Sequence, residues 1–205
     1  SGGQALQSLG FYRRIGRVKT AMTMIASRRQ LRAAFIRWSL LLVPLCILLG
    51  MVSAQISGSG ADDPWFAALR KPAIYPPAYL FAVVWTVLYA MMGFAAALVL
   101  SARGAKGRGL AIVVFFVQLA VNLAWSPVFF GQRDISTALG VVALLDALVL
   151  MTLILFWRVR PLAGLLLVPY LGWVLFATAL NWQFLEANPD AEQPAANGAV
   201  QRVEF

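Results

Sequence analysis

Long apolar runs of about 20 residues, almost free of charge, dominate the chain from residue 38 onward. A helix of this length covers the roughly 30 Å hydrocarbon core of a bilayer. A transmembrane barrel is excluded, because its strands would alternate apolar and polar residues. The pattern predicts an all-α membrane protein, a five-transmembrane-helix bundle, with spans at about 38–57, 78–102, 109–130, 135–157 and 162–185.

Short polar segments at 103–108, 131–134 and 158–161 separate the last four runs. Such tight turns make consecutive helices antiparallel neighbours and favour a compact bundle. We therefore assign residues 38–188 to one transmembrane domain. An N-terminal arm, 1–37, precedes it, and a polar tail, 189–205, follows it.

Within the arm, apolar residues recur at helical spacing between Phe11 and Ile25, and arginines and a lysine occupy the positions between them. This pattern is typical of a basic amphipathic helix that lies on an anionic membrane surface. A solvated arm and an organelle-targeting segment are the alternatives.

Composition supports the membrane assignment, since 61% of the residues are hydrophobic and only 12% are charged. The net charge of +9 does not indicate nucleic acid as a partner, because the cations flank the spans and no nucleic-acid-binding motif is present. Of the 17 cations, 13 fall in the arm and the two turns on its side. The positive-inside rule then predicts a cytoplasmic N-terminus. A bacterial inner membrane is expected, with an organellar membrane as the alternative.

The segment between the first two spans is long for so compact a bundle. Asp63 and Pro64 predict the start of a short helix, and Pro72 predicts a stop after it. Long loops of this kind often act as lids over a site. An interfacial spacer anchored by Trp65 is the alternative.

Three runs carry stripes of aromatic and amide side chains at helical spacing. Amides that faced lipid would cost free energy, so we expect the stripes to face inward and converge on an apolar pocket for a planar ligand. Simple core packing is the alternative. The stripes are Phe81, Trp85, Leu88, Tyr89 and Met92, then Phe115, Gln118, Asn122, Trp125 and Phe129, and finally Tyr170, Trp173, Ala177 and Asn181.

Asp146 is the only acid within a span. An intramembrane carboxyl group indicates function by default; the alternative is a protonated acid hydrogen-bonded to a neighbouring helix. The chain has no histidine and a single cysteine, Cys46, so we expect no metal site and no intramolecular disulfide. The small-residue pairs Gly93 with Ala97 and Ala120 with Ala124 favour close helix contact and suggest a homodimer.

Three motifs resemble those of the TspO/translocator protein family, also called tryptophan-rich sensory proteins or peripheral-type benzodiazepine receptors. They run from Trp65-Phe66 through Lys71-Pro72 to Met92-Gly93, from Gln118 to Gly131, and from Pro169-Tyr170 to Asn181. The resemblance implies a five-helix membrane protein, often a homodimer, that binds porphyrins such as protoporphyrin IX and haem, sterols in some members, and benzodiazepine-type drugs. It also implies, for some members, light-dependent breakdown of porphyrins.

The resemblance assigns roles to particular residues. Trp85 and Trp173 match tryptophans implicated in porphyrin breakdown, and Ala177 matches a position that alters ligand and sterol binding. The sterol-recognition pattern is incomplete here, because the run from Leu180 to Glu186 lacks its tyrosine and its base. From the stripes and the resemblance together, the expected ligand-binding residues are Trp65, Phe81, Trp85, Tyr89, Asn122, Trp125, Trp173, Ala177 and Asn181.

The function expected from the sequence is that of a membrane receptor or sensor that binds porphyrins and regulates tetrapyrrole metabolism or a stress response. No obligatory cofactor is expected, and porphyrin or haem is the ligand. The alternatives are an enzyme that degrades porphyrin in light through Trp85 and Trp173, or a porphyrin or sterol transporter.

Overall fold

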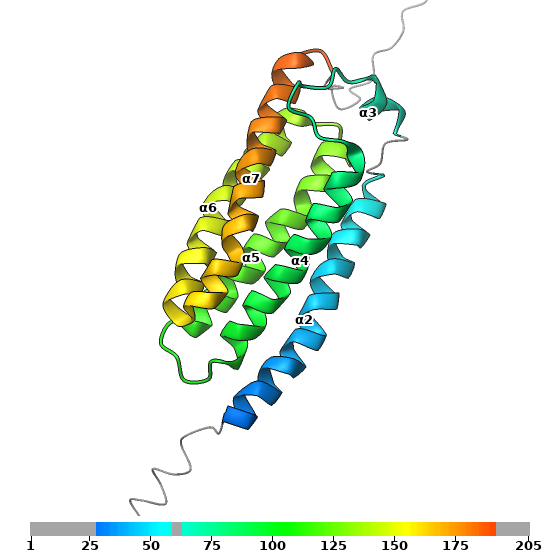
Figure 1. Cartoon of the computed structure of the whole chain (residues 1–205). Coiled ribbons are helices and arrows are strands. Elements are labelled where there is room, and N and C mark those ends of the chain that lie inside the picture. Colours follow the sequence, from blue (N-terminus) through cyan, green and yellow to red (C-terminus); the bar gives the residue numbers. More distant parts are fainter. Residues whose placement is uncertain (1–27, 59–62, 192–205) are drawn as a thin grey trace, which may run out of the picture.

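A computed structural model describes residues 28–58 and 63–191. Within these ranges, five helices are long and apolar enough to cross a membrane, which confirms the predicted fold class. Figure 1 shows them side by side, with one short helix, α3, at one end of the bundle. The helices are α2 (Arg28–Ile56), α3 (Pro64–Ala68), α4 (Ala78–Ser101), α5 (Arg108–Ser126), α6 (Ile135–Val159) and α7 (Pro161–Ala187), and α5 continues into a π-helical turn, η1 (Pro127–Gly131).

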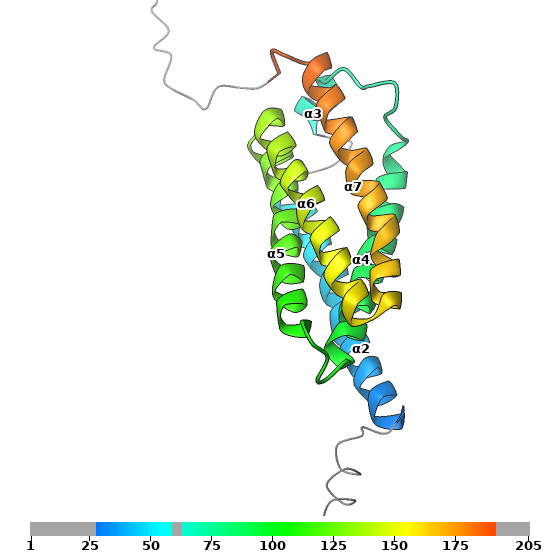
Figure 2. The same ribbon diagram turned by 90° about the vertical axis from the view of Figure 1, so that its left-hand side faces the viewer.

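The long helices form a ring in which α2 packs on α4, α4 on α7, α7 on α6 and α6 on α5. Further contacts of α2 with α5 and η1 close the ring. Figures 1 and 2 show that the α4–α5 and α6–α7 turns lie at the end where α2 begins. The segment between α2 and α4, which includes α3, lies at the other end with the C-terminus of α7.

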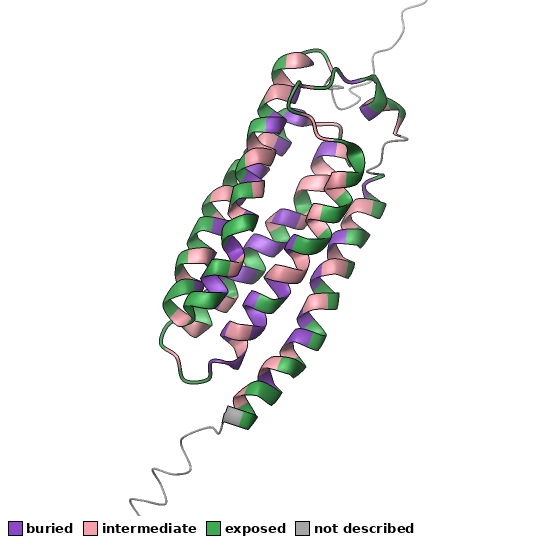
Figure 3. Ribbon diagram, in the orientation of Figure 1, coloured by how far each residue is buried: buried purple, intermediate pink, exposed green. Residues whose placement is uncertain are grey.

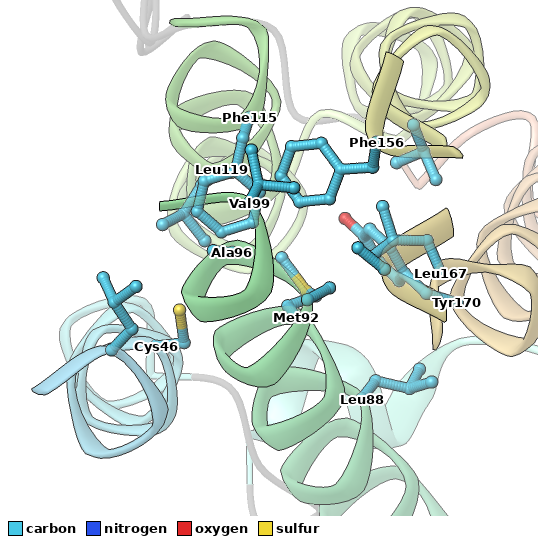
Figure 4. Packing of buried hydrophobic residues seen from close by; sticks show 14 of the residues in the cluster. Cys46, Leu88, Met92, Ala96, Val99, Phe115, Leu119, Phe156, Leu167 and Tyr170 are labelled. Atoms are coloured by element: carbon cyan, nitrogen blue, oxygen red, sulfur yellow. The ribbon is translucent and has the colours of Figure 1, made fainter. Parts of the chain in front are cut away.

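The hydrophobic core lies where the inner faces of the long helices meet. Buried residues lie on these inner faces and exposed residues on the outside (Figure 3). In Figure 4, Leu88 and Met92 of α4 lie between Cys46 of α2 and Tyr170 of α7. The outer faces carry large apolar side chains such as Leu40, which is 73% exposed. In water such a surface would be unfavourable, whereas in a bilayer it faces lipid.

Helix bounds differ from the sequence prediction mainly at the start of the first span. The helix begins at Arg28 rather than near residue 38, because 28–37 contains no proline or glycine and is rich in arginine and alanine. The other four long helices agree with the predicted spans to within about two residues. The predicted amphipathic helix between Phe11 and Ile25 lies outside the described residues.

The turn η1 was not foreseen, and Pro127 explains it. Proline has no backbone N–H, so it cannot bond the carbonyl of Leu123 one turn earlier. The backbone hydrogen bonds here span five residues instead of four, and the Gln132 N–H donates to the Pro127 carbonyl at 2.9 Å. Ser53 of α2 donates its hydroxyl to the freed Leu123 carbonyl at 2.7 Å. The proline thus creates a hydrogen-bonded link between α2 and α5.

Side chains satisfy the backbone groups at several helix ends. Asp63 caps α3 by accepting from the Trp65 N–H at 2.9 Å, as predicted. Asp134 caps α6 by accepting from the Thr137 N–H at 2.8 Å. Hydrogen bonds from Thr137 and Ser136 hold the pKa of Asp134 below its ordinary value. At the end of α4, the Arg108 guanidinium donates to the carbonyls of Val99 and Leu100.

The helices α2 and α4 approach each other closely at Gly93 of α4. A Cβ atom at this position would lie 2.6 Å from the Cα atom of Val43 on α2, closer than packed atoms approach. Glycine is therefore needed here for contact between the helix backbones rather than for its conformational freedom.

We expect Gly93→Ala to destabilise the protein by about 1–3 kcal/mol, because the added methyl group forces α2 away from α4. Gly140→Ala is the matched control, since nothing lies within 4 Å of a Cβ atom there. Thermal unfolding in detergent, followed by circular dichroism, measures both variants. Equal unfolding midpoints for the two would contradict the close α2–α4 contact.

Candidate ligand-binding site

A chain of hydrogen bonds joins polar side chains of α4, α5 and α7 in the middle of the bundle. The Tyr89 hydroxyl donates to Oδ1 of Asn122 at 2.7 Å, and Nδ2 of Asn122 donates to the Tyr170 hydroxyl at 3.1 Å. Tyr170 in turn donates to Oε1 of Gln118 at 2.9 Å. Each of these three hydrogen bonds joins two different helices. Together they fix the rotation of α4, α5 and α7 relative to one another.

These groups are deeply placed. Tyr170 is 1% exposed, and Gln118 and Asn122 are also buried. Figure 4 shows the Tyr170 hydroxyl directed toward the interior of the bundle. The Nε2 atom of Gln118 is buried and has no partner within the described residues. The amides predicted to face inward do so, and they bond mainly to tyrosines of other helices.

A second polar link lies nearer to η1. Nε1 of Trp125 donates to Oδ1 of Asn181 at 3.1 Å, and Nδ2 of Asn181 donates to the carbonyl of Ile135 at 3.0 Å. This link joins α5, α7 and the start of α6. Trp125 also stacks on Phe129 of η1, with ring centroids 5.0 Å apart. The indole of Trp125 is therefore held on both its edge and its face.

The remaining predicted aromatic residues form two pairs. Trp85 lies 5.4 Å from Tyr89, measured between ring centroids, and 6.4 Å from Tyr170. Phe81 lies edge-on to Trp173 at 5.8 Å. Both pairs include a residue of α4. Trp85 therefore packs beside the hydrogen-bonded tyrosines, and Phe81 packs against α7.

An apolar groove of about 400 Å³ lies between α4 and α7. Its open side faces outward, because Val83 and Val87 at its edge are 56% and 52% exposed. Trp173 is the one predicted ligand-binding residue that lines it, and the indole Nε1 of Trp173 is buried without a hydrogen-bond partner among the described residues. The lining residues are Val83, Val84, Val87, Leu88, Met91, Pro169, Gly172 and Trp173.

The loop that contains α3 is fastened to the end of α7. Asn188 bonds both backbone groups of Arg70, accepting from its N–H at 2.7 Å and donating to its carbonyl at 3.0 Å. Nε1 of Trp65 donates to the carbonyl of Ala191 at 3.1 Å. These bonds hold the described part of the loop, residues 63–77, against the end of α7. We call residues 63–77 the cover.

Within the cover, Phe66 packs against a set of rings from α7, η1 and the loop, namely Tyr75, Phe129, Phe130 and Phe184. The Lys71 ammonium lies 4.1 Å from the centroid of Phe66 and donates to the carbonyls of Phe66 and Leu69. Partial desolvation lowers the pKa of Lys71 below its ordinary value.

The nine predicted residues therefore fall into groups rather than around one cavity. Tyr89 and Asn122 belong to the polar chain, Trp125 and Asn181 to the second link, and Trp65 to the cover. Trp85 and Ala177 pack against the core, and Phe81 contacts Trp173 at the groove.

Three residues of this arrangement were absent from the expected set. Gln118 and Tyr170 were visible on the same stripes, and their polar atoms were the signal that could have added them. Asn188 was missed because its partner, the Arg70 backbone, is distant in sequence and carries no side-chain signal.

Metal binding finds no support in the described ranges, which contain no group of three or more His, Cys, Asp or Glu side chains positioned to hold an ion. The chain also has no histidine to serve as an axial ligand of haem iron.

Comparison with known proteins finds one matching family and several similar proteins. The sequence model of the TspO/MBR family matches residues 40–186. Tryptophan-rich protein TspO of Chlorobaculum tepidum is 40% identical over 150 residues, 73% of this chain and 94% of that protein. The tryptophan-rich sensory protein of Cereibacter sphaeroides is 40% identical over 62% of this chain and 78% of its own. The human translocator protein is 38% identical over 58% of this chain and 71% of its own.

We expect Tyr170→Phe to destabilise the bundle more than Tyr89→Phe. The first change leaves Nδ2 of Asn122 and Oε1 of Gln118 without partners, at roughly 1–3 kcal/mol for each buried group, whereas the second leaves only Oδ1 of Asn122. Unfolding in detergent by added denaturant, followed by circular dichroism, compares the two. A smaller loss of stability for Tyr170→Phe than for Tyr89→Phe would contradict the hydrogen-bond chain.

Proposed function

The chain belongs to the TspO/MBR family, and from this premise we propose that it is a membrane receptor or sensor that binds a tetrapyrrole such as protoporphyrin IX or haem. The ligand stacks on Trp173 in the groove between α4 and α7. The protein that has bound it regulates tetrapyrrole metabolism or a stress response. The name of the Cereibacter relative, tryptophan-rich sensory protein, supports a sensory role.

The observation that carries the proposal is the groove at Trp173. Its volume of about 400 Å³ falls within the range of small-molecule sites, and its walls are almost entirely apolar. The buried Nε1 of Trp173 is a donor without an acceptor within the described residues. A tetrapyrrole offers a flat apolar face that matches the apolar walls of the groove and the ring of Trp173.

In this proposal the other predicted residues have two roles. Phe81 supports Trp173 through an edge-to-face contact and fixes the plane of the indole. The polar atoms of Tyr89 and Asn122, and of Trp125 and Asn181, are already bonded to one another. These four residues hold α4, α5 and α7 in the positions that shape the groove, and they do not need to touch the ligand.

The direct test is a titration of the purified protein with protoporphyrin IX, followed by quenching of tryptophan fluorescence. We expect Trp173→Phe to weaken binding by about tenfold, a loss of about 1.4 kcal/mol, because the indole offers a larger stacking face than a phenyl ring.

Trp182→Phe is the matched control, since Trp182 is 54% exposed on the outer face and is absent from the groove lining. Gly172→Leu should also weaken binding by filling the groove. An unchanged affinity for both Trp173→Phe and Gly172→Leu would remove the proposal.

We also propose that the N-terminus is cytoplasmic in a bacterial inner membrane. The exposed cations Arg103, Lys106, Arg158 and Arg160 lie at the end where α2 begins, and no described Asp or Glu lies there. The described acids outside the spans lie at the opposite end, near α3, or at the last turn of α7 and just beyond it. Positive charge is retained on the cytoplasmic side during insertion.

This topology predicts that alkaline phosphatase fused after residue 205 is active and that green fluorescent protein at the same point stays dark. The reverse pair of results would overturn it. Fusions at the 103–108 turn serve as the internal control, because they should give the opposite pattern.

A further inference from the structure

Asp146 is an acid in the middle of a span that no part of the proposed ligand site uses. It lies 11 residues after the first residue of α6, or about 17 Å along the helix axis, near the midplane of a bilayer. Its side chain is half-buried at the seam between α6 and α7. The predicted hydrogen bond to a neighbouring helix is present, because Oγ1 of Thr178 on α7 lies 2.7 Å from Oδ2 of Asp146.

The Thr178 hydroxyl has two oxygen atoms within hydrogen-bond distance but only one proton to donate. Oγ1 of Thr178 also lies 3.0 Å from the carbonyl oxygen of Val174, one turn earlier on α7. A hydroxyl has a single proton to donate, and a carbonyl oxygen can only accept. If Thr178 donates to Val174, the contact with Asp146 is a hydrogen bond only when the carboxyl group itself carries a proton and donates it.

The second carboxyl oxygen leads to the same state. Oδ1 of Asp146 is buried and has no partner among the described residues. An ionised carboxylate would leave half of its charge unpaired in a medium of low dielectric constant. A protonated acid leaves only a neutral carbonyl oxygen without a partner, so the geometry favours the neutral form.

No cation faces Asp146 from the helices packed against α6. The titratable or charged residues of α5 amount to Arg108 at its first position, and those of α7 to Tyr170 and Glu186. On α4 they are Tyr79 and Tyr89, and η1 has none. Tyr89 and Tyr170 are occupied in the polar chain, and Glu186 is in the last turn of α7.

We propose that Asp146 is a proton-binding site within the membrane. The neutral carboxyl group donates to Thr178, Thr178 donates to Val174, and this relay joins α6 to α7 next to Ala177. The proposal includes exchange of this proton with solvent. The site is independent of tetrapyrrole binding, so it stands whether or not the groove at Trp173 binds a porphyrin.

Infrared spectroscopy of the full chain at neutral pH, in vesicles of an ether-linked phosphatidylcholine that has no ester carbonyl groups, tests the site. A protonated carboxyl group has a C=O stretching band at a higher wavenumber than any carboxylate band. We expect one such band, shifted downward in D₂O because the proton exchanges, and absent from Asp146→Asn. Asp190→Asn is the matched control, since it removes an exposed acid at the far end of α7 and should leave the band in place.

Variants of Thr178 test the relay without removing the acid. Thr178→Val should move the band to a higher wavenumber, because the acid loses its acceptor, and Thr178→Ser should restore the original position. The absence of the band in the wild-type protein, or its retention in Asp146→Asn, would overturn the proposal, and no shift in D₂O would overturn proton exchange at the site. The wild-type measurement needs no substitution, so it decides the matter even if a variant fails to fold.

Discussion

Hydrocarbon offers no hydrogen-bond partners, so a polar side chain inside a membrane-spanning bundle finds its partners within the protein. The chain from Tyr89 through Asn122 and Tyr170 to Gln118 is the main consequence of this constraint. Each bond can form only if α4, α5 and α7 have one particular rotation and height relative to one another. Apolar packing alone would tolerate several, because lipid tails and leucine side chains are equally apolar.

The same constraint acts on the backbone. Pro127 removes one N–H from α5, and the structure compensates with a π-helical turn and a hydroxyl group from Ser53 on α2. Arg108 satisfies the last carbonyls of α4. Together with the bonds of the buried amides, these contacts link neighbouring helices of the ring. Gly93 allows the ring to close tightly, because α2 and α4 touch backbone to backbone there.

The placement of the candidate site follows from what the polar chain leaves free. Tyr89, Asn122, Trp125 and Asn181 are bonded to protein partners, so their polar atoms are not directed at a ligand. Trp173 differs, since its N–H has no partner in the described part of the chain and its ring lines an outward-facing groove. Asp146 is also incompletely bonded within the described residues, and it lies at a different seam.

The sequence by itself determined the five spans, their antiparallel order, the cap at Asp63 and the inward direction of the amides, because each of these depends on local hydrophobicity, turn chemistry or the cost of placing a polar group in lipid. It predicted Trp173 as a ligand-binding residue, and it placed Gln118 and Tyr170 on the inward-facing stripes. Only the tertiary structure decided that Tyr89 bonds Asn122, that Asn188 fastens the loop through Arg70, and that the groove opens between α4 and α7. These features depend on the rotation and crossing of whole helices, which are set by contacts such as Gly93 against Val43 that join residues far apart in the chain.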